Sequence, residues 1–253
     1  MRPAMTRMML TMAAAAAIAG YFAAPARTDE PAAVVTLLDG TATAYAAGAK
    51  TGTALSKNDR LLTNQEVQVG ERSRIELRYP DGTVMRFAER SRIKLEDISY
   101  DRMTQSKKLK VGLGGGKLWA NVKKLVTADS KVEVKTVNAV AGVRGTVYRV
   151  TVDEDNSALV KVYDGSVYVS GIPQEVPKPA AQVSGPVPVP GPHEVPPPYR
   201  QVTREEWTVI VQSMQQISIS PQGVASKPED FNLHQDLDDW VKWNQERDKQ
   251  LSL

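Results

Sequence analysis

Histidine and cysteine, which carry much enzyme chemistry, are scarce in this chain of 253 residues. It contains no cysteine, and its two histidines, His193 and His234, lie beyond residue 171. Disulfides, thiolate metal sites and cysteine nucleophiles are therefore excluded. The residues before 171 also cannot form a Ser-His-Asp triad or a usual zinc site. We expect no cofactor and no metal.

Four carboxylates lie close together in the sequence, at Asp81, Glu89, Glu96 and Asp97. A glycosidase needs two carboxylates about 5 to 10 Å apart, so a carbohydrate-active enzyme is one alternative. Turns and strand surfaces carry such residues routinely, however, and a tight turn accounts for Asp81. We therefore expect a protein that is not an enzyme.

The glycine-rich run GLGGGK, residues 112–117, resembles a phosphate-binding loop only superficially. That loop needs four residues between its glycines, and Ser or Thr after its lysine. Here three residues separate Gly112 from Gly116, and Leu118 follows Lys117. The run instead predicts a bulge or kink between two strands.

Basic residues alternate with apolar ones in the first half of the chain, which predicts that they face solvent. They are Arg72, Arg74, Arg78, Arg86, Arg90, Arg92, Lys94, Lys107, Lys108 and Lys110. Such a row of cations could bind an acidic polysaccharide. Interleaved glutamates could equally pair with them across strands, which favours a merely soluble face.

The elements that position these residues are predicted to be strands. Between residues 33 and 169 apolar residues recur at every second position, which is typical of strands with one buried face. Asp-Gly pairs at 39–40, 81–82 and 164–165 predict tight turns. No long helical pattern interrupts them, so residues 33–171 are predicted to form one mainly antiparallel β domain of about ten strands.

The N-terminus has the pattern of a secretory signal peptide over residues 1–26. Arg2 and Arg7 precede an apolar, alanine-rich stretch, residues 8–26, that ends in Ala24-Pro25-Ala26. We expect cleavage near Ala26 and a periplasmic product, with an uncleaved signal anchor as the alternative. Removal of this segment leaves 30 basic against 29 acidic residues, a balance that disfavours nucleic acid as a partner.

Residues 172–202 are rich in proline, with ten prolines between 173 and 198. This composition predicts an extended, semi-rigid polyproline II linker. A ligand for an aromatic groove on another protein is the alternative.

Residues 203–253 are predicted to form a helical tail. Thr203 and Glu206 form a capping box, and the apolar residues that follow at helical spacing predict a helix of about four turns. A second helix is predicted over about 237–250. Their apolar faces must dock on the β domain or on a partner. The candidates for partner docking are Trp207, Ile210, Val211, Met214, Trp240 and Trp243.

Four stretches, in this order, closely resemble the FecR domain family. They are residues 55–87, 109–122, 134–150 and 160–171, the third containing Val143-Arg144-Gly145-Thr146. The resemblance covers roughly residues 34–171. The sequence departs from the family at Val137-Asn138, where Thr-Pro is common, and at Asn58-Asp59, where Gly-Asp is common.

The resemblance implies an extracytoplasmic all-β domain with solenoid-like or jelly-roll-like sheets and no enzymatic activity. It also implies a set of signature residues whose role we predict to be structural. They are Asp81, Gly82, Gly116, Gly142, Arg144, Gly145, Thr146, Asp164 and Gly165. Arg144 is expected at a corner, where its guanidinium could bind several carbonyls or a carboxylate; ligand contact is the alternative.

The name-giving FecR proteins relay a receptor signal to a sigma factor and carry a cytoplasmic anti-sigma region before a membrane helix. Only seven residues precede the apolar stretch here, so direct sigma-factor control is not expected. We expect a non-catalytic exported envelope protein that acts as a protein-interaction or signalling-associated module. The alternative is a module that binds cell wall or acidic polysaccharide. No stable membrane span is expected after signal cleavage.

Overall fold

The computed structural model describes residues 32–172 and 208–251. The predicted signal peptide (1–26) lies outside these residues. So do all but the first residue of the predicted linker (172–202), the capping box at Thr203 and Glu206, and Trp207.

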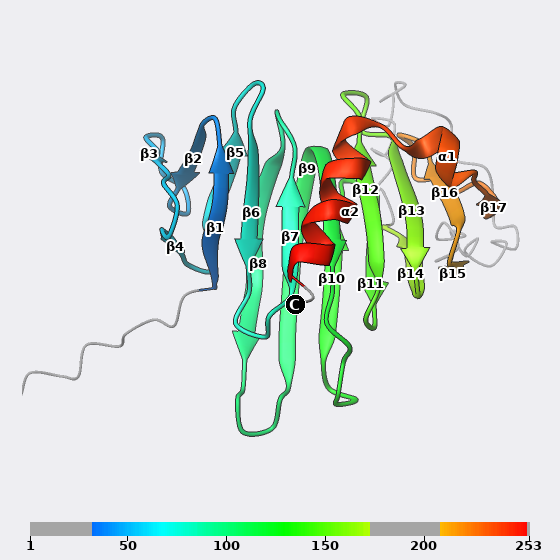
Figure 1. The fold of residues 1–253 in the computed structure, drawn as a ribbon, viewed down its shortest axis with the longest axis horizontal. Coiled ribbons are helices and arrows are strands. Elements are labelled where there is room, and N and C mark those ends of the chain that lie inside the picture. Colours follow the sequence, from blue (N-terminus) through cyan, green and yellow to red (C-terminus); the bar gives the residue numbers. More distant parts are fainter. Residues whose placement is uncertain (1–31, 173–207, 252–253) are drawn as a thin grey trace, which may run out of the picture.

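The described residues form a mainly β fold of seventeen strands in two layers, joined through one long strand (Figure 1). We call one layer the helix-covered sheet. In spatial order it contains β4 (Arg60–Leu61), β1 (Ala33–Asp39), β6 (Arg74–Arg78), β7 (Val84–Phe87), the second half of β9 (Lys107–Asn121), β12 (Val147–Val152), β13 (Ala158–Asp164), β16 (Gln215–Ile219) and β17 (Glu229–Asp230).

The other layer is called the second sheet. In spatial order it contains β3 (Thr53–Ala54), β2 (Ala42–Tyr45), β5 (Glu66–Val69), β8 (Arg92–Tyr100), the first half of β9, β10 (Lys131–Lys135), β11 (Ala139–Val143), β14 (Ser166–Gly171) and β15 (Thr208–Gln212). Strands β9 and β10 run parallel, and the other pairings are antiparallel.

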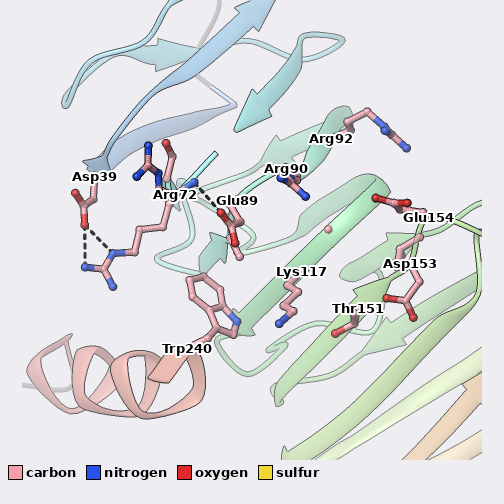
Figure 2. Close-up of a pocket in the computed structure, with 16 residues that line it drawn as sticks. Asp39, Arg72, Glu89, Arg90, Arg92, Lys117, Thr151, Asp153, Glu154 and Trp240 are labelled. Atoms are coloured by element: carbon pink, nitrogen blue, oxygen red, sulfur yellow. Dashed lines mark hydrogen bonds and ion pairs between the residues drawn. The ribbon is translucent and has the colours of Figure 1, made fainter. Parts of the chain in front are cut away.

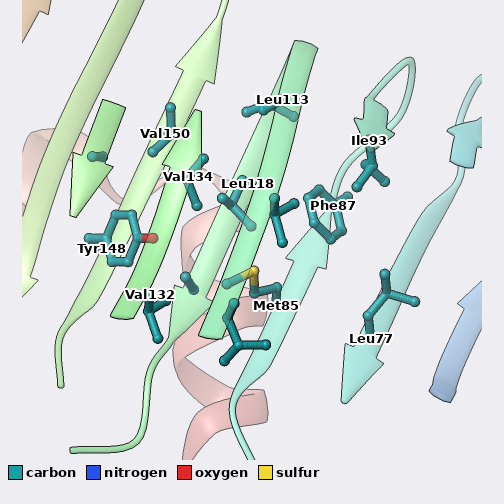
Figure 3. Close-up of a cluster of buried hydrophobic side chains, with 14 of the residues drawn as sticks. Leu77, Met85, Phe87, Ile93, Leu113, Leu118, Val132, Val134, Tyr148 and Val150 are labelled. Atoms are coloured by element: carbon teal, nitrogen blue, oxygen red, sulfur yellow. The ribbon is translucent and has the colours of Figure 1, made fainter. Parts of the chain in front are cut away.

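The core lies between the two sheets and draws side chains from both. Phe87 and Leu118 enter it from the helix-covered sheet, and Leu113 and Val134 from the second sheet (Figure 3). All four are at most 1% exposed. Each such buried side chain contributes about 1.5–3 kcal/mol through removal of apolar surface from water. The alternation of apolar residues that predicted strands with one buried face is therefore confirmed.

Strand β9 bends from one sheet to the other at Gly116. A bulge precedes the bend, where Arg92 is in register with Gly115 while Ile93 is in register with Leu113. The kink predicted for the glycine-rich run is thus confirmed.

Three corners between the sheets share one construction, a glycine in the left-handed region packed against a buried hydroxyl. The pairs are Gly40 with Ser73, Gly116 with Ser91, and Gly165 with Thr146, and the glycine φ angles are +87°, +89° and +87°. A Cβ on these glycines would lie 2.2, 2.4 and 3.1 Å from the respective hydroxyl oxygen. The residue after each glycine also hydrogen-bonds to that hydroxyl, at 2.9, 3.2 and 2.9 Å. No side chain fits at such a corner without displacing a buried hydrogen bond.

The Arg144 corner depends on its neighbours and not on the arginine. Gly145 has φ +91°, and a Cβ there would lie 2.8 Å from the Cα of Lys124. Arg144 is exposed, and its guanidinium has no hydrogen-bond or ion-pair partner among the described residues. The expected network around Arg144 is therefore not formed in the described part of the chain. Gly142, two residues before Arg144, lies within β11 and is in register with Tyr168.

The helix predicted after Thr203 is wrong wherever the structure describes it. Ile210 and Val211 lie in β15, Met214 has φ +65° in the following turn, and β16 then returns. The β-branched run Val209-Ile210-Val211 favours a strand, and β14 offers it backbone partners, while β13 pairs with the returning strand β16. Tertiary pairing outweighed the helical spacing of the apolar residues.

Two short helices end the chain, α1 (Leu233–Asp236) and α2 (Asp239–Leu251). The fold class predicted from the sequence, mainly β with two short helices, is confirmed, as is the second predicted helix. Helix α2 lies across the outer face of the helix-covered sheet (Figure 1). Neither helix of the described residues is long and apolar enough to span a membrane.

The two ends of the proline-rich segment meet in one sheet. Strand β14 ends at Gly171, β15 begins at Thr208, and Ser170 is in register with Thr208. The chain therefore leaves and re-enters the second sheet at neighbouring positions, and the strands on both sides of the segment share one core.

We predict that Gly145→Ala lowers the free energy of unfolding by about 2 kcal/mol or more, because alanine is strained at positive φ and its Cβ meets the backbone of Lys124. Chemical denaturation measures this change. Arg144→Ala and Gly142→Ala are the matched controls, and each should change stability by no more than about 0.5 kcal/mol. A loss at Arg144→Ala equal to that at Gly145→Ala would contradict this account of the corner.

Candidate functional site

Helix α2 is attached to the sheet through buried charges. Arg86 of β7 and Glu76 of β6 are both fully buried, and the Nε of Arg86 donates to Glu76 Oε2 at 2.7 Å. From α2, Asp248 accepts a hydrogen bond from the Nη1 of Arg86 at 2.7 Å. Arg247 donates to Glu76 at 3.0 Å. Two residues of the helix thus complete an ion network that begins inside the sheet.

Three tryptophan side chains surround this network. Trp119 of β9 donates its indole N–H to Asp248 Oδ2 at 2.9 Å. Trp240 and Trp243 of α2 stack with ring centres 5.4 Å apart, and the guanidinium of Arg74 lies 4.3 Å from the ring centre of Trp243. These contacts fix the rotation of α2 about its own axis.

Helix α1 is held in the same way. Asp236 accepts hydrogen bonds from Arg149 at 2.6 Å, Lys161 at 2.8 Å and the hydroxyl of Tyr163 at 2.5 Å. Burial raises the pKa of Asp236, but hydrogen bonds from Lys161 and Tyr163 and the charge of Arg149 outweigh it, so the net pKa is lowered. The C-terminal tail therefore packs on its own β domain through its carboxylates.

A groove of about 800 Å³ opens beside the start of α2, at the edge of the helix-covered sheet where chain corners gather (Figure 2). We call it the rim groove. Its charged and aromatic lining includes Arg72, Arg90, Lys117, Glu154 and Trp240. These residues come from the β5–β6, β7–β8 and β12–β13 turns, from β9 and from α2.

Two of these turns carry the same sequence, Glu-Arg-Ser-Arg, at residues 71–74 and 89–92. The turns are cross-linked, since Glu89 accepts the backbone N–H of Arg72 at 2.7 Å and Glu71 accepts the guanidinium of Arg90 at 3.0 Å. Arg72 and Arg90 both have positive φ, +48° and +57°. Non-glycine residues in this region are uncommon and gather at functional sites.

Several groups in the rim groove are available for a ligand. The side chains of Arg72, Lys117 and Glu154 have no hydrogen-bond or ion-pair partner among the residues that the structure describes. The indole nitrogen of Trp240 is buried and has no partner there either. Figure 2 shows the arginines on one side of the groove, with Asp39 and Glu89 beside Arg72, and Asp153 and Glu154 on the other side. Lys117 and Trp240 lie between them. This arrangement can bind a ligand of mixed charge.

The sequence-predicted turn residues lie apart from the rim groove, except Gly116. Asp81 accepts hydrogen bonds from the N–H and hydroxyl of Thr83 and pairs with Lys107. Gly82 supplies the positive φ of that turn, and Asp164 lies at the corner formed by Gly165, opposite Val147.

Arg86 and Lys107 correct the prediction of a uniformly solvated basic face. Arg86 is fully buried and Lys107 is 4% exposed. Alternation shows which side of a strand a residue occupies, but here helix α2 covers that side at Arg86. At Lys107 the partners are Asp81 and the carbonyl of Lys123.

The predicted partner-docking residues are divided among different surroundings. Val211 lies in the core, and Ile210 is 47% exposed on the second sheet. Trp240 lines the rim groove, and Trp243 stacks against it. The sequence placed the groove arginines only within the long basic row and not in a groove, although the repeated Glu-Arg-Ser-Arg signal could have indicated one. Among the described residues, no cluster of His, Asp and Glu could hold a metal ion.

The described residues thus form a two-layer β module with a helical cover on one sheet. Residues 65–168 match the family model described as FecR protein, so the FecR resemblance is confirmed for that segment. No curated protein matches the chain.

Two crystal structures of a proposed anti-sigma factor from Parabacteroides distasonis ATCC 8503 are similar to it, each at 18% identity over 66% of this chain. Their TM-scores are 0.44 and 0.43, and the chain spans 60% of their length.

We predict that Asp248→Ala lowers the free energy of unfolding by about 3 kcal/mol, because it leaves the buried charge of Arg86 incompletely neutralised. Chemical denaturation followed by tryptophan fluorescence measures this loss. The matched control is Lys249→Ala, an exposed neighbour on α2, which should change stability by no more than about 0.5 kcal/mol. Equal stability of the two variants would contradict the role of the network.

Stability should also fall in acid. Burial raises the pKa of Glu76, but hydrogen bonds from Arg247, Arg86 and Thr36 outweigh it and set the pKa at about 2, below the ordinary value of 4.5. A carboxylate with a depressed pKa stabilises the fold fully above its unfolded pKa, and this contribution is lost as the pH falls from 4.5 towards 2. Denaturation at several pH values should show this decline in the natural chain and a shallower one in Glu76→Gln. Identical pH dependence would contradict the assignment.

Proposed function

We propose that this chain is an exported, non-catalytic FecR-type module that acts in envelope signalling by binding a protein partner in the rim groove. The FecR match over residues 65–168 supports the signalling association. The N-terminal pattern of residues 1–26 supports export to the periplasm. We propose no nucleic-acid partner and no membrane span after signal cleavage.

The observation that carries this proposal is the set of rim-groove charges, on Arg72, Lys117 and Glu154, that have no partner among residues 32–172 and 208–251. The backbone N–H groups of Arg72 and Lys117 donate to the side chains of Glu89 and Ser91, and Trp240 is held on α2 by its stack with Trp243. Preorganised groups lose little conformational entropy when a partner binds, so such a groove favours recognition. Because α2 supplies Trp240, the tail contributes to the site while remaining docked.

The proposal of a binding protein rather than an enzyme rests on how the carboxylates are used. Asp81 accepts hydrogen bonds from Thr83 and Lys107. Glu89 accepts a hydrogen bond from the backbone N–H of Arg72, and Glu96 forms an ion pair with Lys110 at 3.5 Å. These carboxylates hold turns and cations in place. A glycosidase would instead need a carboxylate pair directed at a shared cleft.

A second function, binding of cell wall or acidic polysaccharide, is favoured by a separate observation. The lysines of β8, β9 and β10 that point away from the core lie on the second sheet, whose outer face is not covered by α1 or α2. They are Lys94, Lys108, Lys110, Lys131 and Lys135. Some are paired with glutamates, but the face retains an excess of positive charge.

Site-specific photo-crosslinking tests the first function. A photo-crosslinking amino acid at Thr151, within the rim groove, should yield a discrete protein adduct in the native envelope. Adding Lys117→Glu should lower the adduct at least tenfold, because it reverses a groove charge. The matched control Lys57→Glu lies outside the groove and should leave the adduct unchanged.

The same crosslinker at Met103, an exposed residue of the β8–β9 turn, serves as the positional control. Identical adducts from Thr151 and Met103, or equal loss with Lys117→Glu and Lys57→Glu, would contradict binding in the groove.

A further inference from the structure

A second hollow, of about 310 Å³, lies on the outer face of the second sheet, over the first half of β9. We call it the glycine trough. Gly112 and Gly114 line it together with Arg92, Lys94 and Lys135. Lys94, Gly112 and Lys135 lie in one row across β8, β9 and β10. A glycine is thus placed between two lysines in the middle of a three-stranded surface.

Backbone conformation does not explain these two glycines, although at Gly112 an added Cβ would lie only 3.3 Å from Glu96 Oε1 and from Lys94 Cβ. Of the glycines between 112 and 116, only Gly116 has a positive φ. A glycine inside a strand destabilises it and often marks a place where a ligand or another chain approaches closely. At Gly114 the nearest atom to an added Cβ is Arg92 Nε at 3.7 Å, an ordinary contact distance. A side chain would fit there, and its absence leaves the trough hollow.

Three cations, Arg92, Lys94 and Lys135, and two carboxylates, Glu66 and Glu96, line the trough, which leaves one positive charge in excess. Glu66 faces Lys94 at 3.8 Å, and Glu96 faces Lys110 at 3.5 Å. The ammonium of Lys135 has no ion-pair partner in the part of the chain that the structure describes. Arg92 donates to the carbonyl of Gly114 at 2.6 Å, a bond that leaves its positive charge without a counter-ion.

The backbone around the trough limits what can bind there. Strand β9 is hydrogen-bonded to β8 on one side and to β10 on the other. A peptide therefore cannot add as a further strand, and a ligand must bind through side chains. A flat ligand with many hydroxyls and carboxylates suits this surface, because Lys135 and Arg92 attract carboxylates while Gln68 and Glu66 can bond hydroxyls.

We propose that the glycine trough binds a carboxylate-bearing polysaccharide, with a sugar ring lying over Gly114 and a carboxylate between Lys135 and Arg92. This inference deepens the polysaccharide-binding function and rests on it. It is independent of protein binding in the rim groove, apart from Arg92, which borders both hollows and is left unchanged in the tests.

Calorimetric titration of the full chain with oligogalacturonate, a carboxylated saccharide, tests the proposal. Lys135→Glu reverses the free charge and should weaken binding at least tenfold. Gly114→Val fills the trough and should do the same, with folding checked by denaturation. The matched control Lys131→Glu changes the same charge on the same strand outside the trough, and should leave affinity within twofold. The uncharged methyl ester of the saccharide should not bind.

Absence of oligogalacturonate binding would overturn the proposal. So would equal weakening by Lys131→Glu, which indicates diffuse electrostatic attraction, or equal binding of poly-glutamate, which indicates a general polyanion surface. The rim-groove variant Lys117→Glu should bind the saccharide normally. Failure of the saccharide titration with an intact crosslink at Thr151 would reject the trough alone, and the reverse pattern would reject the rim groove alone.

Discussion

Arg86 is a cation with no exposed surface, and its neutralisation links strands β6 and β7 to helix α2. Glu76, on the neighbouring strand β6, neutralises part of the charge of Arg86, and Asp248 of α2 neutralises the rest. An unpaired buried charge is strongly destabilising, so sheet and helix are stable only together. Arg247, also on α2, forms an ion pair with Glu76 and so completes the network. The C-terminal tail is for this reason a structural part of the module and not an appended arm.

This constraint also shapes the candidate site. With α2 fixed by the ion network and by its tryptophan stack, Trp240 lies against the rim groove beside Arg72 and Lys117. The opposite layer has no such cover in the described part of the chain, and there the glycine trough lies between lysines. The two faces therefore have different chemistry, an aromatic groove of mixed charge and a cationic hollow without aromatic residues.

Local patterns in the sequence were sufficient for much of the fold. Alternating apolar residues predicted the strands, the Asp-Gly pairs marked turns, and the acidic start of α2 marked its beginning. The segment at 208–219 could not be assigned this way, because Val209, Ile210 and Val211 suit either a helix face or a strand. Pairing with β13 and β14, which lie far away in the sequence, decided it. Burial of Arg86 depended on a helix about 160 residues later and had no local signal.

The candidate site was harder to predict because its residues come from six separate segments. Arg144 drew attention between two glycines, yet Gly145 and Thr146 form the corner and Arg144 faces solvent. The repeated Glu-Arg-Ser-Arg sequence indicated the groove better than Arg144 did. Each copy contributes one arginine with a positive φ angle, Arg72 or Arg90, to the rim groove.

The claim that α2 is an integral part of the module can be tested most directly by hydrogen exchange of the full chain, followed by mass spectrometry. If the buried network holds the helix, amides of residues 243–251 should be protected to the same degree as those of β6 and β7, and should exchange with them in one cooperative step. Rapid exchange of α2 while β6 and β7 stay protected would show that the sheet is stable without the helix, and would contradict the account.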